Sequence, residues 1–201
     1  LADAAGNDVY YVDGKYLQYE TMPHRKLSMC QGVGYGMRPH ASGGIGILWE
    51  GGGDDLYRAN AYGQGTSYWF SLGMLVDEEG FDNYSAKIYS QASGIHMGIG
   101  VLADLKGDDN YHSWGLSQSG SHDLGVSYFL DAGGNDMYTC HSASLGGAIN
   151  HAVALFVDRG GRELPIQPDY TGLDVSVSAN QHVHVLLKET ADSEEVVLET
   201  F

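Results

Sequence analysis

Aspartate residues that could bind a cation recur in this sequence at a constant interval. Asp77, Asp104 and Asp131 are 27 residues apart, and another aspartate follows each of them five residues later. Carboxylate oxygens in turns, together with free backbone carbonyls, are the ligands that Ca²⁺ prefers in proteins. The sequence therefore predicts calcium sites with the following ligands: Asp77, Asp82, Asp104, Asp109, Asp131 and Asp136.

Repulsion between these carboxylates is the physical reason to expect a cation. If successive copies wind in register, equivalent carboxylates lie about 4.8 Å apart. Each unscreened pair then repels by about 0.9 kcal/mol in water and by about 3.5 kcal/mol at an effective dielectric constant of 20. Net protein stabilities are only about 5–15 kcal/mol, so a cation, backbone amides or both must neutralise the column. The alternative, in which the carboxylates only accept hydrogen bonds from amides of their own turns, stays open, because Asp-Gly turns also form without metal.

The aspartates belong to a longer repeat with the consensus Asp-x-x-Gly-x-Asp-x-Tyr. It covers residues 1 to about 163, and the first copy carries an insertion around residues 13–44. Before each acidic turn, apolar residues alternate with small ones, as in residues 71–74. This period of two indicates a strand with an apolar face in the core and a small face that another element can approach closely. A glycine-rich helix is the competing interpretation, but glycine at this frequency weakens helices.

A repeat of 27 residues matches the perimeter of one coil in a three-sided solenoid. We therefore expect an all-β protein, a parallel β-solenoid of about six coils, over residues 1–163; propeller blades usually need about 40 residues or more. Residues 164–201 are expected to cap it, with residues 174–178 and 182–187 forming a β-hairpin. The chain starts at Leu1, in phase with the repeat and without a methionine. We therefore expect it to be a processed or excised part of a longer protein.

The turn motif resembles sequences of known type. Asp-x-x-Gly-[Asn/Asp]-Asp-x-Tyr looks like the glycine- and aspartate-rich repeats of uncharacterised bacterial proteins. It is also distantly similar to the calcium-binding parallel β-rolls of secreted RTX proteins, most closely at Gly133, Gly134 and Asp136. Those β-rolls have nine-residue units, two per coil, instead of 27-residue units. The resemblance implies a solenoid and favours calcium, and it carries no enzymatic activity with it.

Composition limits the partners of the protein. Lys and Arg number 10 against 26 Asp and Glu, for a formal net charge of −16, which argues against a nucleic-acid partner. No apolar run approaches the roughly 20 residues of a membrane span. Carbohydrate or other protein subunits are the expected partners, self-association is possible for an open-ended solenoid, and the expected location is extracellular or at the cell surface.

Two more columns follow the same period. The tyrosines are predicted to form an internal aromatic ladder, although an exposed platform for sugar rings is the alternative. The glutamines are predicted to form amide ladders between coils. The two columns are Tyr57, Tyr84, Tyr111 and Tyr138, and Gln64, Gln91 and Gln118.

The insertion carries four of the ten basic residues, which distinguishes it from the acidic repeats. Loops on rigid scaffolds often carry function, so it is either a ligand loop or a surface that touches another subunit. His182 and His184, on one face of an expected strand, lack a third ligand and are interpreted as a polar strand face. The candidate residues of the ligand loop are Tyr16, Tyr19, His24, Arg25, Arg38 and His40.

Three functions remain open on these observations. The favoured one is a non-catalytic, calcium-stabilised scaffold or adhesion module, because no catalytic constellation accompanies the acidic turns. The second is a polysaccharide-active lyase or hydrolase that uses carboxylate pairs such as Asp54 with Asp55, or Asp108 with Asp109. The third is a filament subunit that self-assembles through open solenoid ends.

Overall fold

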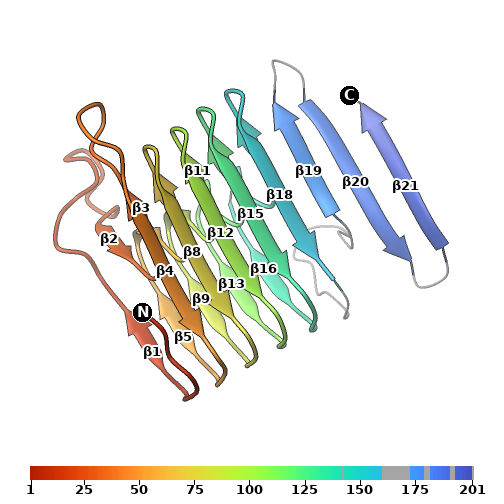
Figure 1. The fold of residues 1–201 in the computed structure, drawn as a ribbon, viewed down its shortest axis with the longest axis horizontal. Helices are drawn as coiled ribbons and strands as arrows, with labels where there is room; N and C mark the ends of the chain where they lie inside the picture. Colours follow the sequence, from red (N-terminus) through yellow and green to blue (C-terminus); the bar gives the residue numbers. More distant parts are fainter. Residues whose placement is uncertain (142, 160–172, 179–181, 191–192, 201) are drawn as a thin grey trace.

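The structure is a computed structural model, and the part of the chain that it describes consists of β-strands joined by turns (Figure 1). It describes residues 1–141 and 143–159, and the backbone of strands β19 (Leu173–Ser178), β20 (His182–Thr190) and β21 (Ser193–Thr200). Parallel strands stack along one axis, which confirms the predicted parallel β-solenoid. No helix of the described residues could cross a membrane.

One long strand per coil forms the main wall of the solenoid, in which Asp77 pairs with Asp104 and Asp104 with Asp131. Equivalent residues therefore lie directly beside one another, as the 27-residue period predicts. The five long strands delimit four complete turns of the solenoid. The predicted number of six coils included incomplete copies of the repeat at both ends. The strands are β4 (Ile45–Glu50), β8 (Leu72–Asp77), β12 (Ile99–Asp104), β15 (Val126–Asp131) and β18 (Val153–Asp158).

Shorter strands complete each coil in three further parallel sheets. The first follows the acidic turn: β1 (Val9–Tyr11), β5 (Leu56–Arg58), β9 (Asn83–Ser85), β13 (Asn110–His112) and β16 (Met137–Thr139). The second contains β2 (Leu27–Cys30), β6 (Ala61–Gly63) and β10 (Ile88–Ser90). The third contains β3 (Gly34–Tyr35), β7 (Ser67–Tyr68), β11 (Gly94–Ile95), β14 (Ser121–His122) and β17 (Ala148–Ile149).

The extra residues of the first coil do not form one segment. Strands β2 and β3 lie within residues 13–44 and pair with β6 and β7 as regular parts of the coil. Leu27 pairs with Ala61 and Cys30 with Gly63, so β2 holds an extra residue in a bulge. The other extra residues lie in the connections from β1 to β2 and from β3 to β4.

Beyond β18, the main sheet continues with antiparallel strands instead of another coil. β19 pairs with β18, β20 with β19, and β21 with β20 (Figure 1). The predicted hairpin is therefore present as β19 and β20. Strand β21 is a third strand that the sequence analysis did not anticipate.

The small face of each long strand points into the solenoid, which corrects the predicted orientation. In β8, Gly73, Leu75 and Asp77 are buried, whereas Leu72 and the other alternate residues are half-buried. The interior is narrow: a Cβ atom added to Gly73 would lie 1.9 Å from the carbonyl oxygen of Thr66. A residue without a side chain is therefore required at this position, whereas Leu75 on the same inward face packs into the core, and the apolar residues that alternate with them form the outer face.

This narrow interior makes Gly73→Ala a strongly destabilising substitution. The new methyl group would collide with backbone atoms, which cannot rotate away, and overpacking of this kind costs about 1–3 kcal/mol. Gly44→Ala is the matched control, because a Cβ atom there meets nothing within 4 Å. Urea unfolding of both variants measures the difference, and equal stabilities would contradict the inward orientation of the small face.

Tyrosine rings fill the interior beside the long strands. Tyr57, Tyr84 and Tyr111 are fully buried, and their ring centroids are 4.6 and 4.7 Å apart with nearly parallel planes. Tyr138 continues the stack on Tyr111 at 5.0 Å, and Phe129 packs edge-on against Tyr111, also at 5.0 Å. The predicted internal aromatic ladder is confirmed, and the exposed sugar platform is excluded for this column.

The buried glutamines connect neighbouring coils differently from the predicted ladder. Gln91 Nε2 donates to the carbonyl oxygen of Tyr84 in its own coil, at 3.3 Å, and to that of His112 in the next, at 3.2 Å. Gln64 makes the equivalent pair of bonds. The amides thus bond to the backbone of two coils and join each coil to the next.

Candidate metal centres in the buried acidic columns

The predicted ligand residues lie on both sides of one turn in each coil. Asp77 ends the long strand β8, and Asp82 precedes β9, so the turn between them brings the two side chains together inside the solenoid. Parallel stacking repeats this arrangement in the next coils. The resulting clusters are Asp55–Asp77–Asp82, Asp82–Asp104–Asp109 and Asp109–Asp131–Asp136.

Each cluster has the dimensions of a cation site. One carboxylate oxygen from each member lies within 4.8 Å of the oxygens from the other two. All six predicted ligands belong to these clusters, together with Asp55, which lies 27 residues before Asp82 and was not predicted as a ligand. Asp3, Asp8 and Glu50 form a similar but more exposed group at the first coil.

Tyrosine hydroxyls hold one side of the column formed by Asp77, Asp104 and Asp131. Asp104 Oδ2 accepts a hydrogen bond from the Tyr84 hydroxyl at 2.7 Å. Asp77 Oδ2 accepts from the Tyr57 hydroxyl at 2.5 Å and from that of Tyr84 at 3.3 Å. The aromatic ladder therefore positions the carboxyl groups as well as filling the core.

Backbone amides of the neighbouring coil hold the second column, which consists of Asp82, Asp109 and Asp136. Asp82 Oδ1 accepts from the backbone N–H of Asp55, and Asp109 Oδ1 from that of Asp82, both at 2.7 Å. Asp136 Oδ1 accepts from the N–H of Asp109 at 2.8 Å. The amides come from the preceding coil and not from the turn of the same aspartate, so the carboxyl groups also lock the coils in register.

These bonds leave one oxygen of most of these carboxyl groups without a donor. The oxygens are buried, and a buried acceptor without a partner costs about 1–3 kcal/mol, more when it is charged. Among the described aspartates of these clusters, the buried oxygens that accept no hydrogen bond from a tyrosine hydroxyl or a backbone amide include Asp55 Oδ2, Asp77 Oδ1, Asp82 Oδ2, Asp104 Oδ1 and Asp109 Oδ2.

Burial changes the protonation of the clusters. Desolvation and the charge of Asp77 raise the pKa of Asp82 to about 8. Desolvation also raises the pKa of Asp109 to about 8; an amide hydrogen bond opposes this shift, and the charge of Asp131 reinforces it. The pKa of Asp104 is also raised well above its usual value, first by burial and then by Asp109 and Asp131. Without a cation, the column therefore holds protons at neutral pH.

The adjacent aspartates proposed as a catalytic pair diverge. Asp55 is buried in the first cluster, whereas Asp54 is exposed and its Oδ1 accepts the backbone N–H of Phe81 at 3.1 Å. Asp109 is likewise buried, and Asp108 is exposed and bonded to Asn135. Neither of these two adjacent pairs presents both carboxylates to one substrate, because one member of each pair is buried and the other is exposed.

The candidate ligand loop lies over the sheets formed by β6 and β10 and by β7 and β11. The Arg38 guanidinium lies 5.3 Å from the ring centroid of Trp69 and contacts His96, and the carbonyl oxygen of His24 accepts a hydrogen bond from Lys87. The loop residues Tyr16, Tyr19 and His40 are exposed, and Arg25 is half-buried. Of these loop residues, Arg38 contacts a further cluster of potential metal ligands.

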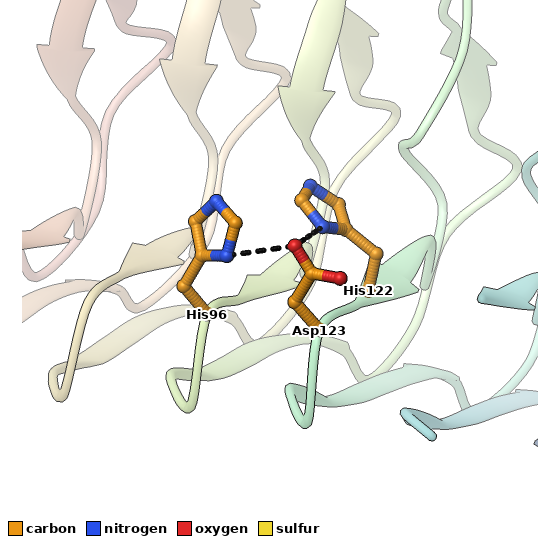
Figure 2. Close-up of side chains that lie close together, drawn as sticks. All are labelled: His96, His122 and Asp123. Atoms are coloured by element: carbon orange, nitrogen blue, oxygen red, sulfur yellow. Dashed lines mark ion pairs between the residues drawn. The ribbon is translucent and has the colours of Figure 1, made fainter. Parts of the chain in front are cut away.

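That cluster, which the sequence analysis missed, consists of His96, His122 and Asp123 (Figure 2). The histidines occupy adjacent positions of the repeat instead of one column, so a search for columns overlooks them. His182 and His184, the histidines that the sequence analysis did consider, lie in β20, whose side chains are outside the described part of the structure. No family model, curated protein or solved structure matches the chain.

Proposed function

We propose that this protein is a non-catalytic β-solenoid scaffold that binds calcium in its buried acidic columns and acts outside the cell or at its surface. One observation carries the proposal: buried carboxylate oxygens that no tyrosine hydroxyl or backbone amide satisfies lie in clusters of three. A cation would satisfy these oxygens and remove the repulsion between coils at the same time.

The chemistry of the clusters favours calcium over other cations. Every potential ligand in them is an oxygen, which suits Ca²⁺ and Mg²⁺ better than transition metals. Mg²⁺ usually keeps several water molecules, and Asp82, Asp104 and Asp109 are at most 1 % exposed, which leaves little space for water. Extracellular calcium modules bind with dissociation constants of about 10⁻⁴–10⁻³ M, so weak sites of this type suit a secreted protein.

The outer face of the main sheet supports a scaffold role. Ile45 is 72 % exposed and Ile47 is 46 % exposed on β4, and Ile99 is 46 % exposed on β12, which β8 separates from β4. Exposed apolar side chains on one sheet face are typical of sites where proteins associate. Contact with other protein subunits is therefore the function that we assign to this face, with the calcium columns keeping it rigid.

Thermal unfolding with and without calcium tests the proposal. A ligand at 100 times its dissociation constant stabilises a protein by about 2.7 kcal/mol per site, so calcium should raise the Tm by many degrees and chelation should reverse the change. Magnesium at the same concentration is the control and should have a much smaller effect. An unchanged Tm after chelation, in protein that metal analysis shows to be free of calcium, would contradict it.

A further inference from the structure

We propose that His96, His122 and Asp123 form a separate site for a divalent transition-metal ion such as Zn²⁺ (Figure 2). His96 directly follows β11, His122 ends β14, and Asp123 comes next in the chain. Ile95 pairs with His122, so His96 lies beside Asp123 in the neighbouring coil. The solenoid register thus brings three ligand side chains from two coils to one corner.

The three side chains converge on one point. The Nδ1 atoms of His96 and His122 lie 2.9 and 3.1 Å from Asp123 Oδ2, and the potential ligand atoms are within 4.8 Å of one another. Zinc binds imidazole nitrogen and carboxylate oxygen at about 2.0–2.2 Å, which in tetrahedral geometry separates ligand atoms by about 3.3 Å. Both nitrogen–oxygen distances are within a few tenths of an ångström of this separation.

Neighbouring groups orient these ligands. Asn150 Nδ2 donates to Asp123 Oδ1 at 2.8 Å, which leaves Oδ2 directed at the histidines. The ring of Tyr68 packs edge-on against His96 at 5.1 Å, and the ring of Tyr89 lies 5.6 Å from that of His122. Outer contacts of this type fix ligand geometry in metal sites.

The donor set distinguishes this corner from the acidic columns. Two imidazole nitrogens and one carboxylate oxygen favour Zn²⁺, Co²⁺, Ni²⁺ or Cu²⁺ over Ca²⁺. Three protein ligands also leave one tetrahedral position for water or a small ligand. The side chain of Asp123 is 37 % exposed, so an ion could enter from solvent.

Substitution of Arg38 distinguishes a metal site from a purely structural cluster. Its Nη1 lies 3.2 Å from His96 Nε2 and can only donate, so Nε2 accepts and the ring proton is on Nδ1. A metal bound at Nδ1 requires the proton on Nε2, so Arg38 must release the ring. Arg38 therefore competes with the ion, both through this hydrogen bond and through its charge.

The experiment titrates Zn²⁺ calorimetrically into calcium-saturated protein that carries His182→Ala and His184→Ala, and follows Co²⁺ binding by its visible absorption. We expect one equivalent to bind. His96→Ala, His122→Ala and Asp123→Asn should each weaken binding by more than the roughly 10- to 100-fold that loss of an outer-shell partner costs. Arg38→Gln should strengthen binding several-fold.

A double variant, His112→Ala with His141→Ala, is the matched control. These rings also lie close together, with centroids 6.5 Å apart, but belong to none of the clusters that could hold a metal, so its affinity should be unchanged. The proposal is overturned if the three ligand substitutions leave Zn²⁺ affinity unchanged, or if Arg38→Gln weakens it. Arg38 is exposed, so its variant gives a result even if a ligand variant unfolds. The outcome does not depend on the calcium columns.

Discussion

Replacing Asp104 with asparagine is expected to stabilise the calcium-free protein and to reduce its stabilisation by calcium. Asp104 is fully buried between Asp82 and Asp109. Asparagine has nearly the same shape and needs no proton to stay uncharged, and its Oδ1 can still accept the hydrogen bond that Tyr84 now donates at 2.7 Å. Its amide N–H groups would also supply donors to neighbouring oxygens that now have none.

The same substitution removes one of three carboxylates from a proposed calcium site. Because calcium affinity depends on the number of ligand charges, we expect binding there to weaken at least about tenfold, or about 1.4 kcal/mol. Urea unfolding at pH 8, with a chelator and with calcium, measures both effects. Asp108→Asn is the control, since Asp108 is exposed beside Asp109 and outside the clusters. Lower calcium-free stability with an unchanged calcium effect would contradict the account.

The calcium-free protein is expected to lose stability as the pH rises from about 5 to about 8. The pKa values of Asp82 and Asp109 are about 8 in the folded protein, against about 3.9 in an unfolded chain. Between these values the folded state binds more protons than the unfolded state, so the free energy of unfolding falls with rising pH. Each carboxyl group that stays protonated contributes a slope of up to about 1.4 kcal/mol per pH unit.

Calcium should weaken this pH dependence, because it replaces the protons in the clusters. Urea unfolding at several pH values, with chelator and with calcium, measures the two slopes. Asp82→Asn combined with Asp109→Asn should flatten the calcium-free profile. A calcium-free stability that is constant or rises over this range would show that the carboxyl groups do not hold protons.

The register of the solenoid was predictable because a strict period leaves no freedom in the pairing of coils. Once Asp77 pairs with Asp104, the positions of Asp82 and Asp109 follow, and so does the stack of Tyr84 on Tyr111. Column membership is a property of spacing alone. The predicted ligands of the clusters were therefore identified without knowledge of the side-chain geometry.

The sequence alternation does not predict which face of each long strand points into the solenoid. Gly73 and Leu72 alternate, and hydrophobicity alone places the larger residue inside. The structure reverses this because the carbonyl of Thr66 lies against Gly73 and leaves no space for a side chain. The width of the interior depends on how the strands and turns of a whole coil close, and no local sequence pattern specifies that width.

The histidine cluster was hidden for a different reason. His96 and Asp123 occupy one column and His122 the adjacent one, and both His96 and Asp123 have positive φ, at 49° and 53°. Left-handed turn residues of this kind decide which way a side chain points. The sequence shows the residues but not the corner at which they meet.

Calcium content measured after equilibrium dialysis tests the central claim most directly. The account predicts about three Ca²⁺ per chain at saturation, one for each buried cluster of three aspartates, and clear loss in the variant that combines Asp82→Asn with Asp109→Asn. The Asp108→Asn control should retain them. Protein that is folded and fully stable at pH 9 without bound calcium would contradict the claim.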